Sequence, residues 1–72
     1  MTNSEIVQCL IDEKVKEQRQ TMTTEKVLEH LATGIGLNKL FLEISTKEEE
    51  KRYYQAALDR IKYWINELKE GK

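Results

Sequence analysis

Seventy-two residues with a single cysteine, Cys9, can hold one small core but no internal disulfide bond. Twelve basic and thirteen acidic residues give a net charge of −1, and the two signs are mixed along the chain. This mixture provides neither a basic face for a phosphate backbone nor an acidic block that mimics one. No stretch approaches the ~20 apolar residues of a membrane span, and the first residues lack the pattern of a signal peptide. We therefore expect a single domain over residues 1–72, located in the cytoplasm, with no membrane segment.

The first predicted helix begins at Thr2, which forms a capping box with Glu5, and runs to about residue 19. Its apolar residues cover about half of the helix surface, as expected of a helix that contacts two neighbours; they are Ile6, Val7, Leu10, Ile11 and Val15. Cys9 lies about 150° from the centre of this face, so we expect it to be exposed and assign it no reactive role. Asp12 and Glu13 are expected to be solvated.

Residues 21–24 form a polar break, and a second helix is predicted over residues 24–33. Gly34 suits the end of that helix, and residues 34–36 would make a tight corner. Residues 37–44 then form a short, strongly apolar helix. Whether residues 24–44 form two helices or one helix and a loop stays open.

The clearest pattern lies in residues 46–70, which form a long amphipathic helix. Ser45 with Glu48 and Thr46 with Glu49 offer two overlapping capping boxes at its start. Its apolar residues recur every three or four positions on a face about 120° wide; they are Tyr54, Ala57, Leu58, Ile61, Trp64, Ile65 and Leu68. We expect Trp64 in the core and fraying at residues 71 and 72. The fold class is all-α: a small bundle of about four helices, three main and one short.

Side chains that carry catalysis or bind metals are sparse. His30 is the only histidine, so neither a catalytic pair nor a histidine-based metal site can form around a second imidazole. The Gly34-x-Gly36 segment lacks the preceding strand, the third glycine and the lysine of phosphate-binding loops. We expect no enzyme activity, no metal and no cofactor.

Two surface features favour a protein partner. Residues 35–44 carry more apolar side chains than one short helix can bury, and Tyr63 lies about 155° from the apolar face of the last helix. The predicted partner-binding residues are Leu40, Phe41, Leu42, Ile44 and Tyr63. A homodimer is the expected oligomer.

Residues 28–46 resemble a helix-turn-helix unit, in which the second helix reads the major groove of DNA. The resemblance rests on the inner apolar positions, the small residue and the turn glycine, namely Leu31, Ala32, Ile35, Gly36, Leu37 and Leu42. It implies DNA contacts from Asn38 and Lys39. The outward positions of that second helix, however, are Leu40, Phe41 and Ile44, which are apolar.

The leading hypothesis is a small non-enzymatic interaction or regulatory module. By analogy of size it resembles inhibitors and modulators encoded by phages or mobile elements. The alternatives are a helix-turn-helix DNA-binding transcriptional regulator and a structural subunit of a larger assembly.

Overall fold

The computed structural model describes residues 2–70, and within them the chain forms three α-helices and no strand. The helices are α1 (Asn3–Thr21), α2 (Thr24–Ile44) and α3 (Glu48–Lys69). The predicted all-α class is thus confirmed. No helix among these three is long and apolar enough to cross a membrane. The fraying predicted at residues 71 and 72 lies outside the described residues.

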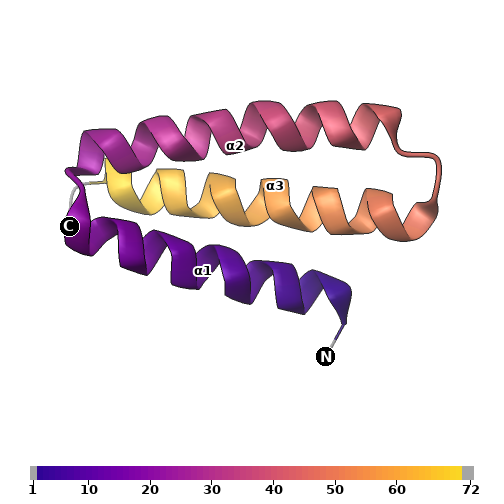
Figure 1. Cartoon of the computed structure of the whole chain (residues 1–72), viewed down its shortest axis with the longest axis horizontal. Helices are drawn as coiled ribbons and strands as arrows, with labels where there is room; N and C mark the ends of the chain where they lie inside the picture. The colour runs from indigo at the N-terminus through magenta and orange to yellow at the C-terminus, as the bar shows by residue number, and fades with distance from the viewer. Residues whose placement is uncertain (1, 71–72) are drawn as a thin grey trace.

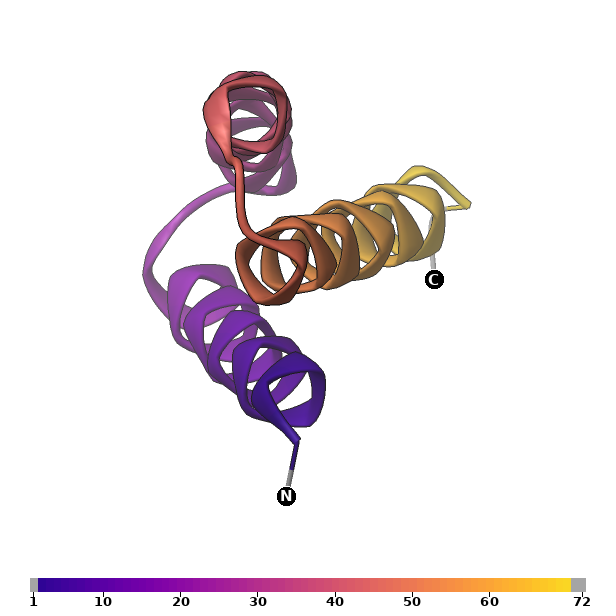
Figure 2. The ribbon, with the colours of Figure 1, turned by 90° about the vertical axis from the view of Figure 1, so that its right-hand side faces the viewer.

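The three helices are arranged around α3, which packs against both of the others (Figure 1). α1 and α2 are joined by a short connection at residues 22 and 23, and they contact each other far less than either contacts α3. From this connection they diverge, so that the start of α1 and the end of α2 lie well apart (Figure 2). The bundle is therefore open on the side between α1 and α2.

The core follows the inner side of α3. One buried cluster joins all three helices and comprises Val15, Val27, Leu31, Ile61 and Leu68. A second cluster lies between α1 and α3, where Val7 packs on Ala56 and Ala57. The two alanines let α1 approach α3 closely, and Ile11 packs against both clusters. This core is small for the length of the helices and leaves large apolar side chains outside it.

The predicted fourth helix is not confirmed, because residues 24–44 form one continuous helix. The sequence predicts a corner at residues 34–36 because glycine suits the position just after a helix end, and a glycine inside a helix is unfavourable by about 1 kcal/mol relative to alanine. Packing on α3 outweighs this local preference. A Cβ atom at Gly34 would lie 3.2 Å from Cδ1 of Ile61, so glycine allows the close approach of α2 and α3. The turn required by the helix-turn-helix interpretation is absent, and that interpretation of residues 28–46 is wrong.

The helix starts agree only in part with the predicted caps. At α1 the amide of Glu5 donates to Oγ1 of Thr2 over 3.2 Å, as expected. At α3 the predicted capping boxes are wrong: the cap residue is Lys47, and it makes no side-chain cap hydrogen bond. The hydroxyl of Ser45 instead donates to the carbonyl of Phe41 over 2.6 Å and closes the end of α2. The connection is so short that Ser45 belongs to the preceding helix.

Candidate interaction surface

The most exposed apolar side chains of α2 form a line along its second half. Leu37, Leu40, Phe41 and Ile44, here called the α2 stripe, have exposed fractions of 50%, 52%, 39% and 66%. Their spacings of three, one and three residues put them on one face of the helix. The ring centroids of Phe41 and Tyr54 lie 5.4 Å apart, so Tyr54 of α3 packs against the stripe.

A second exposed apolar pair lies on α1. Ile6 and Leu10, here called the α1 edge, are 41% and 55% exposed and lie one helical turn apart. Nothing within the described chain buries either side chain fully. The α1 edge is therefore a second exposed apolar surface, separate in sequence from the α2 stripe.

A shallow cavity lies between α1 and α2, and its lining includes neither the α1 edge nor the α2 stripe. This cavity, of about 130 Å³, lies between α1 and α2 with Ile61 of α3 beneath it, and its walls include Lys14 of α1 and His30 of α2. Leu37 and Ile44 follow His30 by seven and fourteen residues, so they lie on the same flank of α2. Leu10 precedes Lys14 by one turn and continues the wall of α1. From their connection onward the two helices diverge (Figure 2).

The predicted partner-binding residues do not all belong to the α2 stripe. Leu40, Phe41 and Ile44 do, but Leu42 is only half-exposed. Leu42 follows the buried Leu31 by eleven residues, three full turns, and so lies on the side of α2 that packs against α3. Leu42 is therefore part of the support of the stripe and not of the stripe itself.

Tyr63 belongs to a different part of the molecule. It is 44% exposed, the guanidinium of Arg60 lies 4.4 Å from its ring centroid, and its ring meets that of Trp64 edge to face. Arg60 in turn binds α1. The two predicted surface features, residues 40–44 and Tyr63, thus lie on different flanks of the bundle.

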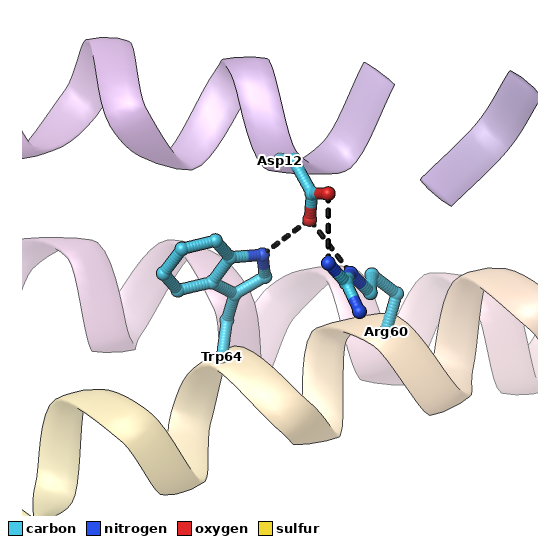
Figure 3. A network of polar contacts seen from close by, with 3 residues as sticks. All are labelled: Asp12, Arg60 and Trp64. Carbon is cyan, nitrogen blue, oxygen red and sulfur yellow. Dashed lines mark hydrogen bonds and ion pairs between the residues drawn. The ribbon is translucent and has the colours of Figure 1, made fainter. Parts of the chain in front are cut away.

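A polar network that the sequence did not predict fastens α1 to α3 (Figure 3). Nε and Nη2 of Arg60 donate to Oδ1 and Oδ2 of Asp12 over 2.7 and 2.8 Å. Nε1 of Trp64 donates to Oδ1 of the same carboxylate over 2.7 Å. The expectation that Asp12 is solvated is wrong, because all three donors converge on it. Trp64 is only half-buried, so it is both a packing and a hydrogen-bonding residue.

The charges of this network are mutually stabilised. Hydrogen bonding from Arg60 lowers the pKa of Asp12, with a smaller contribution from the Trp64 indole and against the effect of partial burial. The hydrogen bond to Asp12 likewise raises the pKa of Arg60. A carboxylate saturated by three donors is held ionised and is a poor general base. The geometry assigns Asp12 to joining two helices.

The remaining candidate residues are scattered. Nδ2 of Asn38 donates to the carbonyl of Gly34 over 2.8 Å and is half-buried, whereas Lys39 is exposed, so the two residues proposed to contact DNA do not share an outward face. His30 and Cys9 are exposed. Within residues 2–70, no group of three His, Cys, Asp or Glu side chains is placed to hold a metal ion.

Comparisons with protein family models, with curated proteins and with solved structures find no match to this chain.

Proposed function

We propose that this chain is a small non-enzymatic protein–protein interaction module that binds a helical protein segment through the α2 stripe and the α1 edge. The observation that carries the proposal is the set of exposed apolar side chains of the α2 stripe and the α1 edge, which the described part of the chain leaves uncovered. The four side chains of the α2 stripe and the two of the α1 edge together leave on the order of 500 Å² of apolar surface in water, divided between the two helices. Apolar side chains that lie next to one another on an exposed helix face, as in the α2 stripe, are typical of protein-binding surfaces.

The open side of the bundle supports a helix as the bound element. Two diverging helices over a third leave the position that a fourth helix occupies in a four-helix bundle. Spacings of three and four residues on the α2 stripe match the ridges that helices use to pack on one another. Binding without chemistry is the mode of action of inhibitors and regulators, and the small size of the chain agrees with that role. The DNA-binding alternative has lost the turn on which it rested.

The proposal is tested by affinity capture from host cells with three forms of the chain as bait: wild type, Leu40→Glu and Asn66→Glu. Leu40 is 52% exposed, so a glutamate there leaves the fold intact and places a charge in the middle of the stripe. Asn66→Glu adds the same charge at an exposed position of α3 and is the matched control.

We expect protein bound to the wild type and to Asn66→Glu, retained after nuclease treatment, and lost with Leu40→Glu. A second copy of the chain also counts as a bound partner, and it is recognised because it is expressed with a different tag from the bait. Equal capture by all three baits, or capture that disappears with nuclease, would contradict the proposal.

A further inference from the structure

We propose that the α2 stripe is covered by a second copy of this chain, in an antiparallel pairing of the two α2 helices about a two-fold axis near Leu40. This inference rests on the proposed function and names the partner. It is drawn from the size of the apolar surface, the arrangement of the stripe and an otherwise unexplained glycine at position 36.

The size of the surface suits a dimer of modest affinity. Pairing of the two α2 stripes would bury about 700 Å² of apolar surface in the two copies together, and burial of the α1 edges as well would raise this to about 1,000 Å², near the lower limit of specific interfaces. The core of the single chain is small, with only Val15 and Val27 almost completely buried among its larger side chains. Short chains without disulfides or metals commonly gain the missing burial by self-association. A micromolar dissociation constant is the expected range.

The stripe is complementary to itself when one copy is turned end for end. With the axis between Leu40 and Phe41, Leu37 of one copy lies opposite Ile44 of the other. In the same way, Leu40 of one copy lies opposite Phe41 of the other. The four side chains of the stripe are apolar, so no charge is buried by the pairing. Each copy can therefore present a ridge and receive the ridge of its partner.

Gly36 gives an independent reason to expect a close helix neighbour. It lies inside α2, where glycine is unfavourable by about 1 kcal/mol relative to alanine. Unlike Gly34, it has no close neighbour among residues 2–70, where a Cβ atom at this position would meet nothing within 4 Å. Gly36 precedes Leu37 and lies one turn before Leu40, so it leaves a notch beside the stripe. Such a notch allows a second helix to approach closely.

The first experiment is sedimentation equilibrium over about 5–500 µM chain, the range in which a weak dimer dissociates. We expect the wild type and Asn66→Glu to dimerise equally, and Leu40→Glu to have a dissociation constant at least about tenfold higher while keeping its helical circular dichroism. Gly36→Ala is expected to weaken the dimer several-fold although it favours the helix of the separate chain. A wild type that stays monomeric, or a dimer indifferent to Leu40→Glu, overturns the inference.

The position of the axis is tested by cross-linking in a Cys9→Ser background. Residues near a two-fold axis approach their own copies, so Leu40→Cys should oxidise to a disulfide-linked dimer, because Cβ atoms about 4 Å apart satisfy the bond. Asn66→Cys, on the exposed side of α3, should remain reduced under the same conditions. A dimer in which Leu40→Cys fails to cross-link overturns the antiparallel pairing.

Failure of this inference and failure of the proposed function have different signatures. If the chain is monomeric but its α2 stripe captures another protein, the dimer inference is wrong and the proposed interaction function stands. A monomeric chain whose capture is unaffected by Leu40→Glu overturns both.

Discussion

The hydrogen-bond network at Asp12 should be the largest single polar contribution to the stability of this chain. In the substitution Asp12→Asn, the side chain keeps its size, loses its charge and turns an amide toward the Arg60 guanidinium. Three hydrogen bonds converge on the carboxylate, and the side chains of Asp12 and Arg60 are 23% and 31% exposed. α1 has few other polar ties to α3.

The magnitude follows from these contacts. A hydrogen bond to a charged group contributes about 1.5–3 kcal/mol, but water reaches part of this network and can replace a lost partner. One acceptor oxygen also survives in asparagine. We therefore expect Asp12→Asn to lower the free energy of unfolding by about 2 kcal/mol, out of the roughly 4–10 kcal/mol typical of a chain this size. The Tm should fall by about 8–16 °C.

The assay is urea unfolding followed by far-UV circular dichroism, with Glu13→Gln as the matched control. Glu13 is the neighbouring exposed acid of α1, so its substitution removes the same charge without breaking the network. The comparison is made at low chain concentration, where self-association does not contribute. Equal stabilities of Asp12→Asn and Glu13→Gln would refute the reasoning.

The pH dependence gives a second check on the same network. Because the pKa of Asp12 is lowered in the folded chain from its ordinary value of 3.8, folding favours the carboxylate. The stabilisation is then complete above the unfolded pKa and is lost as the pH falls through the lower folded pKa. The difference in stability between wild type and Asp12→Asn should be constant from about pH 7 to about pH 5 and shrink below about pH 3.5. A difference that persists unchanged into acid would argue against an ionised, hydrogen-bonded Asp12.

Four further substitutions test the packing and the caps, each by urea unfolding. Lys47→Asp should raise the free energy of unfolding by about 0.5–1 kcal/mol, since α3 lacks a side-chain cap; no gain would mean that the start of α3 is already satisfied. Trp64→Ala should cost about 2–3 kcal/mol, less than the 3–5 kcal/mol of a fully buried tryptophan, because Trp64 is half-buried; complete loss of folding would place it in the core. Gly36→Ala should stabilise the separate chain by about 0.5–1 kcal/mol, whereas Gly34→Ala should gain less or nothing because its Cβ meets Cδ1 of Ile61 at 3.2 Å; equal gains would contradict the close packing at Gly34.

Sequence periodicity was a good guide wherever one helix decides the outcome. The first and last helices, the Thr2 cap and the exposure of Cys9 and Tyr63 follow from spacing along the chain and from local hydrogen bonding. The apolar excess of residues 35–44 also pointed to an exposed surface. These features depend on residues within one or two turns of each other, and their physics is local.

Other features depended on residues far apart in the chain. Asp12 lies 48 residues from Arg60 and 52 from Trp64, so no local pattern brings the three together. The i, i+4 spacing of Arg60 and Trp64 puts two hydrogen-bond donors on one face of α3. The acceptor that they share, on α1, becomes known only from the packing of the two helices.

What the sequence by itself determined is the helical class, the amphipathic faces and the apolar character of residues 37–44, because these follow from side-chain periodicity. Only the tertiary structure decided that residues 24–44 form one helix, since the burial of that helix on α3 outweighs the preference of Gly34 and Gly36 for a break. It also decided which apolar residues stay outside. Leu42 packs toward α3 and Leu40 faces water, because the direction in which α3 lies is a property of the assembled helices and not of either segment alone.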